Sequence, residues 1–286
     1  MAIKMVKFIA EVSSNHHQDL ERCYRFIDVA ASIGCDAVKF QLFKLEELFS
    51  KEAIRARPEF EERKKWELPV EFLPKLKSRC VEVGLEFSCT PFYLAAVDEL
   101  KPYVDFFKIA SYELTWLDLT KKIAATKKPL LMSTGMADLS EIQAAIATFR
   151  ENGGENLSLL HCISGYPTPV NECNLSAIET LRHKFNVDVG WSDHSNRSSV
   201  IHRAISKFDA ATIEFHLDLD GQGDEFKTGH CWLPEDIKEV IDTVRLYFDM
   251  DGHGEKKAMP SEEFDRTWRA DPIDGQRPLR ITRSQL

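Results

Sequence analysis

The chain has 286 residues, 43% of them hydrophobic and 29% charged, so it can bury one large core. Its formal net charge of -9 argues against a nucleic-acid-binding protein, because affinity for nucleic acid comes mainly from Lys and Arg that neutralise phosphates. Residues Met1 to Ala10 lack a signal-peptide pattern, and no stretch approaches the roughly 18 apolar residues that a transmembrane helix needs. We therefore expect a cytoplasmic protein with small-molecule ligands and no membrane contact.

The cysteines form no C-x-x-C pair, and their odd number does not suit a disulfide framework. They are Cys23, Cys35, Cys80, Cys89, Cys162, Cys173 and Cys231. We expect reduced and mostly buried thiols. Cys162 follows His161 and is a candidate nucleophile, but packing is the favoured role for it.

Short apolar runs rich in strand-forming residues alternate with amphipathic segments of helical period. The predicted strands are Phe8–Ser13, Ala37–Leu42, Glu86–Thr90, Phe106–Ser111, Pro129–Thr134, Leu157–Ile163, Val187–Ser192 and Ala211–Leu217. The predicted helices are Leu20–Ser32, Val70–Val83, Leu94–Lys101, Leu117–Thr126, Leu139–Arg150, Ala177–Phe185, Ser198–Phe208 and Pro234–Phe248. Such a series predicts an α/β fold, the (β/α)₈ or TIM barrel, because a closed barrel leaves no strand as an edge.

Two regions fall outside this alternation. We expect the barrel to occupy residues 1–250, and residues 251–286 to form a C-terminal extension that wraps the surface or reaches a neighbouring subunit. The long charged segment from Phe43 to Leu68 follows the second strand. A solvated surface loop or helix is favoured for this segment, and a lid or subunit contact is the alternative.

Two lysines are predicted inside strands. Lys39 shares one strand face with Gln41, and Lys108 lies in the fourth strand. A buried lysine is costly unless it meets a negative group, so the pair predicts a phosphate or carboxylate ligand at the barrel mouth. The alternative is that both lysines bridge to internal carboxylates such as Glu11 or Glu214.

Hydroxyl side chains recur near the predicted strand ends. They belong to Ser88, Thr90, Ser111, Ser133, Thr134, Ser164 and Ser192. Hydroxyls and backbone N–H groups there can bond phosphate oxygens without adding charge. Any one of them is also common at strand ends and helix caps, so it is their recurrence that indicates an anion site.

Two histidines near the ends of the last two strands form a candidate metal site. His194 and His216 lie on neighbouring strands and can share a divalent cation that keeps open positions. Glu214 and Asp193 are predicted to orient them or join the metal shell. For each imidazole a hydrogen-bonded core role is the alternative.

The other histidines are weaker candidates. His16 and His17 follow the first strand and are candidates for substrate contact, and His161 lies in the sixth strand. A surface role is expected for the rest, namely His183, His202, His230 and His253.

Several motifs occur together in order. They are Ile9-Ala10-Glu11 with Asn15-His16, Asp36 to Gln41, Ser88 to Phe92, Lys108 to Ser111, Ser133 to Met136, His161-Cys162 with Tyr166-Pro167, and Ser192-Asp193-His194. From about Phe8 to Phe248 the chain resembles the catalytic barrel of the N-acetylneuraminate (sialic acid) synthases and their relatives that make legionaminic, pseudaminic and spore-coat sugars.

This resemblance implies condensation of phosphoenolpyruvate with an N-acylated amino-sugar aldehyde such as N-acetylmannosamine, in a homodimer. It places phosphoenolpyruvate at Lys39, Thr90, Lys108, Ser111, Ser133 and Ser192, to which the strand-end pattern adds Ser164. It implies that His194 and His216 bind Mn²⁺ or a similar ion, that Gln41, Glu113 and Tyr166 lie near the sugar, and that Glu11 acts at the catalytic centre with Lys39 and Lys108.

The chain departs from the family pattern at Tyr112, which replaces a glycine, at Phe215, which replaces a lysine, and at Ser164, where an asparagine is common. The acidic sugar-binding residue after the last strand has no clean counterpart near Gly223 to Lys227. The antifreeze-like domain of many relatives is expected to be absent. That domain supplies an arginine to the sugar site, and Arg269, Arg277 and Arg280 are candidates to replace it.

Two other functions stay open on this sequence. One is another metal-dependent aldol-type barrel, a 3-deoxy-keto acid phosphate synthase or a lyase. The other is a sugar-acid binding barrel without turnover. Phosphate release from phosphoenolpyruvate separates a synthase from a lyase, because a lyase has no phosphate to liberate.

Overall fold

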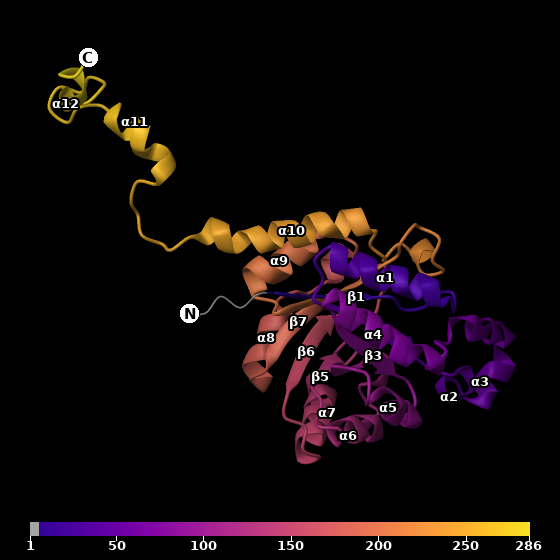
Figure 1. The fold of residues 1–286 in the computed structure, drawn as a ribbon. Coiled ribbons are helices and arrows are strands. Elements are labelled where there is room, and N and C mark those ends of the chain that lie inside the picture. Colours follow the sequence, from indigo (N-terminus) through magenta and orange to yellow (C-terminus); the bar gives the residue numbers. More distant parts are fainter. Residues whose placement is uncertain (1–5) are drawn as a thin grey trace. The chain divides into compact units, whose positions relative to one another are not determined.

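The computed structural model describes residues 6–286, apart from the side chain of Phe248, and its main body is a closed barrel of parallel strands in chain order (Figure 1). Residues 1–5, which belong to the segment inspected for a signal peptide, lie outside it. The strands are β1 Lys7–Glu11, β2 Ala37–Leu42, β3 Glu86–Pro91, β4 Phe106–Ile109, β5 Leu130–Ser133, β6 Leu157–Cys162, β7 Asp188–Asp193 and β8 Thr212–His216. The predicted barrel is confirmed.

In the first of the two units described below, helices lie outside the strands, as Figure 1 shows. The helices of the chain are α1 Leu20–Ser32, α2 Leu45–Leu48, α3 Lys51–Ala56, α4 Leu73–Val83, α5 Leu94–Leu100, α6 Leu117–Ala124, α7 Leu139–Glu151, α8 Ala177–Phe185, α9 Ser198–Phe208, α10 Pro234–Asp251, α11 Glu263–Thr267 and α12 Arg280–Arg283. The 3₁₀ helices are η1 Pro58–Trp66, η2 Val70–Phe72, η3 Ser111–Glu113, η4 Val170–Glu172, η5 Phe226–Thr228 and η6 Pro260–Glu262.

Element ends differ from the predictions where local chemistry stops the element. β1 ends at Glu11 rather than Ser13, because Ser13 adopts a left-handed φ of 49° that no extended strand has. Helix α4 begins at Leu73 rather than Val70, because Pro74 occupies its first turn and a proline further inside would clash with the preceding turn. Each difference is a few residues and leaves the order of elements unchanged.

The local sequence explains why the helices form and which face they bury. Helix α1 begins where the Asp19 side chain accepts the N–H of Glu21, and it buries Phe26 and Ile27 against the barrel. Helix α7 begins with a reciprocal capping box between Asp138 and Glu141. The strands are buried on both faces, as in parallel sheets covered by helices.

The barrel interior changes from apolar to polar along the strands. Near their starts, Ile9, Ala37, Phe106, Leu131 and Leu160 form a buried apolar cluster. Near their ends the register pairs polar residues: Glu11 with Lys39 and His216, Gln41 with Thr90, and Ser192 with Glu214. Side chains of neighbouring strands in register point the same way, so these residues converge at the C-terminal mouth, where barrel active sites lie.

The chain divides into two compact units, Met1–Leu246 and Tyr247–Leu286. Within the second unit, the Asp271 carboxylate accepts the N–H groups of Ile273 and Arg280, and Arg283 pairs with Asp274 at 2.7 Å. The contacts of Arg280 and Arg283 tie α12 to the loop that precedes it. Arg269, Arg277 and Arg280 belong to this unit, and their predicted role at a sugar site stays a prediction.

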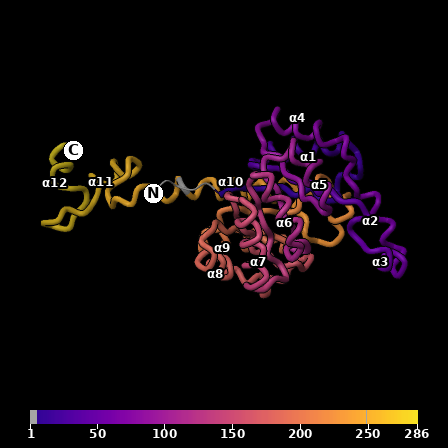
Figure 2. The backbone as a smooth tube through the Cα atoms, turned by 90° about the horizontal axis from the view of Figure 1, so that it is seen from below, coloured from indigo at the N-terminus to yellow at the C-terminus, as the bar shows by residue number. Residues whose placement is uncertain are grey.

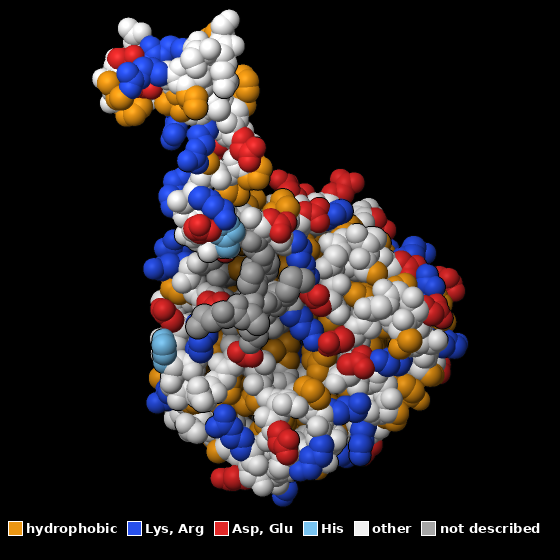
Figure 3. Space-filling model, turned by 60° about the vertical axis from the view of Figure 1, so that its left-hand side comes forward, with side chains coloured by type: hydrophobic (Ala, Val, Ile, Leu, Met, Phe, Trp, Pro, Cys, Tyr) orange, Lys and Arg blue, Asp and Glu red, His pale blue; other side chains and the backbone are white. Residues whose placement is uncertain are grey.

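Among the described residues, charged side chains of both signs are mixed over the face drawn in Figure 3. All seven cysteines are free and buried, as predicted. None of the helices between residues 6 and 286 combines the length and apolarity needed to cross a membrane.

Candidate active site

A cavity of about 640 Å³ opens at the C-terminal mouth of the barrel. Every strand contributes to its wall, through Glu11, Lys39, Gln41, Thr90, Lys108, Ser133, Cys162, Ser192, Glu214 and His216. Loop residues complete the wall, among them Ser111, Glu113, Tyr166, His194, Glu225 and His230. Of the residues that the strand-end pattern or the family resemblance assigns to phosphoenolpyruvate, the sugar, the catalytic centre or the metal ion, all line this cavity except Ser88, Thr134 and Ser164. The Ser88 and Thr134 hydroxyls instead donate to the Phe106 and Leu160 carbonyls.

The two strand lysines are buried and paired with carboxylates. Lys39 pairs with Glu11 and lies 3.8 Å from Glu214 Oε2, while Lys108 Nζ lies 2.8 Å from Glu214 Oε1. Lys39 Nζ also donates to Thr90 Oγ1 at 3.2 Å. The alternative considered from the sequence, lysines bridged to Glu11 and Glu214, is thus present in the structure. The same cations face the cavity and are available to an anionic ligand.

Burial and charge act in opposite directions on these groups. Burial lowers the pKa of Lys39 to about 8, because a desolvated ammonium is disfavoured. Burial alone would raise the pKa of Glu214, but the Lys108 and Lys39 charges outweigh it and lower that pKa to about 2. Glu214 is therefore ionised and holds both lysines in place.

A cradle of small polar groups surrounds Gly135. A Cβ atom placed on Gly135 would lie 2.5 Å from Ser164 Oγ, 2.8 Å from Ser111 Oγ and 3.1 Å from Cys162 Sγ. The Gly135 N–H donates to Ser111 Oγ at 3.1 Å, and Ser164 Oγ has no partner among the described residues. Ser164 lies in this cradle rather than on the cavity wall. Of these groups Ser111 and Cys162 also line the cavity, where the Ser111 hydroxyl can bond a phosphate oxygen.

Cys162 lies in this cradle as a buried thiol. Burial raises the pKa of this thiol, and its Sγ lies 3.1 Å from Ser111 Oγ. A thiol with a raised pKa is a poor nucleophile. The favoured packing role therefore agrees with its surroundings.

His194 and His216 lie side by side with ring centroids 5.3 Å apart. His194 Nδ1 lies 2.8 Å from the Ile163 carbonyl, and His216 Nδ1 lies 2.9 Å from Glu225 Oε2. An acceptor at Nδ1 fixes the tautomer and leaves the Nε2 lone pair for a metal ion. Burial lowers the pKa of His194 to about 3 and also lowers the pKa of His216, which favours the neutral imidazole that a metal ion needs. These residues therefore fit a divalent cation.

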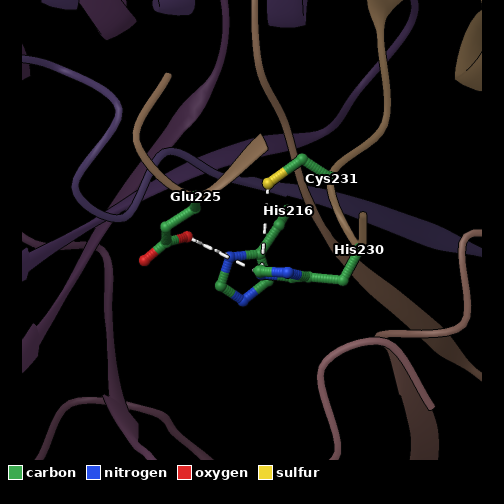
Figure 4. Close-up of side chains that lie close together, drawn as sticks. All are labelled: His216, Glu225, His230 and Cys231. Atoms are coloured by element: carbon green, nitrogen blue, oxygen red, sulfur yellow. Dashed lines mark hydrogen bonds and ion pairs between the residues drawn. The ribbon is translucent and has the colours of Figure 1, made fainter. Parts of the chain in front are cut away.

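The loop after β8 adds donors that the sequence prediction missed. His216, Glu225, His230 and Cys231 each bring one ligand atom to within 4.8 Å of the others (Figure 4). Burial would raise the pKa of Glu225, but its bonds with His216, His230 and Ser13 hold that pKa well below its ordinary value. The expected surface role of His230 is wrong, because this residue is only 3% exposed and lines the cavity.

The predicted sugar-side residues line the same cavity. Gln41 Nε2 donates to Glu11 Oε1 at 2.9 Å and to Ser13 Oγ at 3.0 Å. The Tyr166 ring lies over His194 with centroids 4.3 Å apart. Burial raises the pKa of Glu113 to about 7, so this carboxyl can exchange a proton near neutral pH.

A family profile described as the NeuB family matches residues 26–256. The chain belongs to the NeuB family. Among curated relatives, an uncharacterized protein of Methanocaldococcus jannaschii is 40% identical over 256 residues, which cover 89% of this chain and 74% of the relative. The N,N'-diacetyllegionaminic acid synthase of Campylobacter jejuni is 36% identical over 276 residues, which cover 91% and 82%.

A solved structure supports the same assignment. The N-acetylneuraminic acid (sialic acid) synthetase of Leptospira borgpetersenii, in complex with citrate, aligns with a TM-score of 0.80 and 30% identity over 91% of this chain and 90% of that chain. The family resemblance predicted from the motifs is confirmed.

Two further predictions about this NeuB-family chain are wrong. Asp193 does not orient His194, since its carboxylate accepts from Ser195 and from the Trp191 and Trp232 indoles. It follows Ser192 on the strand, so its side chain points to the opposite face from the cavity. His16 and His17 do not line the cavity either; His16 is fully buried and His17 is exposed.

The segment from Phe43 to Leu68 is only in part the solvated element that the sequence favoured. It contains α2, α3 and η1, and α2 and α3 stand on one side of the barrel in the ribbon view and in the tube view (Figures 1 and 2). Many of its charged side chains are exposed, but Phe49, Arg63 and Trp66 line the cavity. The high charge content of this segment gave no indication that its aromatic residues pack inward.

Proposed function

We propose that this NeuB-family chain condenses phosphoenolpyruvate with an N-acylated amino-sugar aldehyde, giving a nine-carbon 2-keto sugar acid and inorganic phosphate. The observation that carries the proposal is the placement of buried Lys39 and Lys108 in one cavity with hydroxyls at the strand ends and two buried imidazoles. The name of the Campylobacter jejuni relative, a legionaminic acid synthase, supports the substrate class.

In this proposal the lysines exchange carboxylate partners for substrate. Lys39 and Lys108 hold the carboxylate and phosphate of phosphoenolpyruvate, and Thr90, Ser133 and Ser192 add neutral hydrogen bonds. Glu11 and Glu214 balance the lysine charges before substrate binds. Their presence keeps the ammonium groups positioned, so little reorganisation is needed when the substrate arrives.

The bond changes follow from the substrates. The C2–C3 electron pair of phosphoenolpyruvate forms the new bond from C3 to the aldehyde carbon, whose oxygen takes a proton. Water then adds at C2 and gives up a proton, for which Glu11 is the proposed acceptor. The bond between C2 and the phosphate oxygen then breaks, and its electron pair leaves with the phosphate. The hydroxyl that remains on C2 loses its proton and becomes the ketone oxygen.

His194 and His216 are proposed to hold Mn²⁺ or a similar divalent ion, with Nδ1 of each ring already bonded as described. When bound, such an ion supplies Lewis-acid polarisation of the aldehyde oxygen. Gln41, Glu113 and Tyr166 line the same cavity and are proposed to orient the sugar.

Release of inorganic phosphate tests the proposal. The chain is incubated with phosphoenolpyruvate, Mn²⁺ and one of several acceptors: N-acetylmannosamine, its 6-phosphate, and diamino sugars. Lys39→Ala should abolish release, while Lys44→Ala, at a half-exposed lysine outside the cavity wall, should not. Phosphoenolpyruvate that binds but releases no phosphate with any acceptor would favour the non-catalytic barrel. Failure to bind it would end the proposal.

The neighbouring possibilities give different results in this assay. A 3-deoxy-keto acid phosphate synthase would release phosphate with simple aldose phosphates and not with N-acylated sugars, and a lyase would release none. The homodimer and the cytoplasmic location stay predictions. Sedimentation velocity of the purified chain tests the dimer.

A further inference from the structure

Arg63 enters the cavity from η1, the 3₁₀ helix between β2 and α4. Its guanidinium carbon lies 5.3 Å from the ring centroid of Phe49, 5.2 Å from that of Phe60 and 5.5 Å from that of Trp66. Aromatic faces attract a cation but leave the five guanidinium N–H donors without strong acceptors. The rings therefore position Arg63 while its hydrogen-bonding capacity stays available.

The backbone that carries Arg63 is fixed to the barrel. Gln18 Nε2 donates to the carbonyls of Lys64 and Glu67, both at 2.9 Å. The Trp66 indole donates to Asp224 Oδ2 at 2.7 Å. A guanidinium on an anchored backbone loses little freedom when it binds a ligand, so its position favours recognition.

Arg63 differs from the basic residues around it in having no acidic partner. Lys64 pairs with Glu46 at 2.8 Å, and Lys65 pairs with Asp224 at 3.1 Å. The two strand lysines of the cavity are also paired. Within residues 6–286 no hydrogen bond or ion pair of the Arg63 side chain is present. Among the Lys and Arg side chains of the cavity wall that the structure describes, Arg63 is therefore the one whose charge no carboxylate balances.

A second group of the cavity wall also lacks a partner. The Ser14 hydroxyl is buried, lines the cavity and has no hydrogen-bond partner in the described part of the chain. A buried unsatisfied hydroxyl is costly unless a ligand or water bonds to it. Both observations indicate that this cavity binds a polar ligand group in addition to the ligand groups that contact residues at the strand ends.

We propose that Arg63 binds an anionic group, a phosphate monoester or a carboxylate, carried by the acceptor sugar. The proposal rests on the proposed function and names the substrate class of the same site. Phosphoenolpyruvate is assigned to the lysines at the strand ends, whereas Arg63 comes from the segment that follows β2, together with Phe49 and Trp66. Planar guanidinium donors match two oxygens of a phosphate or carboxylate at once.

Kinetics with matched acceptors test this inference. Phosphate release is measured with N-acetylmannosamine, with its 6-phosphate and with the corresponding amino-sugar uronate, for the wild type, Arg63→Gln and Lys64→Gln. The two variants remove the same charge one residue apart, and Lys64 points to the exposed Glu46 instead of the cavity. Direct binding of the same three sugars is measured by calorimetry without phosphoenolpyruvate.

We expect the wild type to prefer one of the anionic acceptors, and whichever is preferred identifies the anionic group. Arg63→Gln should lower kcat/KM and affinity for that acceptor about 10- to 100-fold, as expected for lost charged hydrogen bonds, while Lys64→Gln leaves both nearly unchanged. A wild type that prefers the neutral sugar overturns the inference. So does an Arg63→Gln variant that loses only affinity for phosphoenolpyruvate.

The binding measurement distinguishes failure of the proposed function from failure of the proposed role of Arg63. Absent phosphate release with every acceptor counts against the proposed function, and the affinity ratio between variants still decides the role of Arg63. Release that is normal and insensitive to Arg63→Gln leaves the proposed function intact and refutes the role of Arg63. Arg63→Lys is a second variant that keeps the charge, and it should recover part of the affinity.

Discussion

Glu225 Oε2 lies 2.9 Å from His216 Nδ1, so a carboxylate on the loop after β8 fixes the imidazole on the strand before it. The bond makes Nδ1 the protonated nitrogen and leaves Nε2 as an electron-pair donor. A carboxylate behind a histidine also raises the basicity of that ligand. Glu225 is therefore expected to act on metal affinity through His216.

Glu225→Gln should weaken Mn²⁺ binding about 10- to 100-fold while the protein stays folded. Calorimetric titration with Mn²⁺ measures the change. Glu235→Gln, an exposed substitution at the start of α10 with the same loss of charge, is the control and should bind as the wild type does. Equal affinity in the two variants would show that Glu225 does not support a metal ligand.

Gly135→Ala should disturb the phosphate end of the cavity. The added methyl group would lie 2.5 Å from Ser164 Oγ and 2.8 Å from Ser111 Oγ, so it would displace Ser111, which lines the cavity. We expect affinity for phosphoenolpyruvate to fall at least about tenfold, since charged hydrogen bonds are lost. Ser111→Ala removes one hydroxyl without filling the space and should have a smaller effect. Calorimetric titration with phosphoenolpyruvate, with inorganic phosphate as the competitor, compares the affinities of the wild type, Gly135→Ala and Ser111→Ala. If Gly135→Ala binds as the wild type does, the phosphate group binds elsewhere.

The sequence predicts the barrel and the strand-borne part of the site because both follow from period-two alternation. Lys39 and Gln41 share a face, and in-register pairing with neighbouring strands brings Thr90 and Glu11 beside them. The same alternation explains the error at Asp193, which sits between two inward residues and therefore points outward. Adjacency in sequence to His194 suggested a contact that strand geometry forbids.

Loop-borne residues could not be placed in this way. Glu225 and His230 reach the cavity because the loop after β8 folds back over the mouth, where Asn15 accepts the Glu225 N–H at 3.1 Å. That contact joins residues 210 positions apart, and no local period encodes it. Arg63 was not predicted as a site residue for a related reason, since its segment is mostly charged and exposed. The available signal was the position of both loops after barrel strands, where functional residues concentrate.

Affinity for phosphoenolpyruvate should fall at alkaline pH because of Lys39. Burial lowers the pKa of this ammonium to about 8, and the anionic substrate needs the protonated form. The KM for phosphoenolpyruvate is therefore expected to be constant below that pH and to rise about tenfold per pH unit above it. The KM for a neutral acceptor, measured in the same buffers, serves as the control and should not rise. A flat KM for phosphoenolpyruvate up to about pH 10 would mean that Lys39 keeps an ordinary pKa.

Gly190→Ala should destabilise the barrel itself. Gly190 lies in β7, and a Cβ atom there would collide with the Thr212 carbonyl oxygen and lie 2.8 Å from Leu160 Cδ2. The carbonyl belongs to the neighbouring strand and cannot rotate away, so the strands must separate or twist. We expect the free energy of unfolding to fall by about 2–3 kcal/mol, as for overpacking of a rigid core.

Urea titration followed by circular dichroism measures the change. Gly165→Ala is the matched control, because the nearest atoms to its added methyl lie 3.9 Å away, and it should change stability by less than about 0.5 kcal/mol. If the two variants unfold at the same urea concentration, β7 and β8 have enough space between them at Gly190 to accept a methyl group.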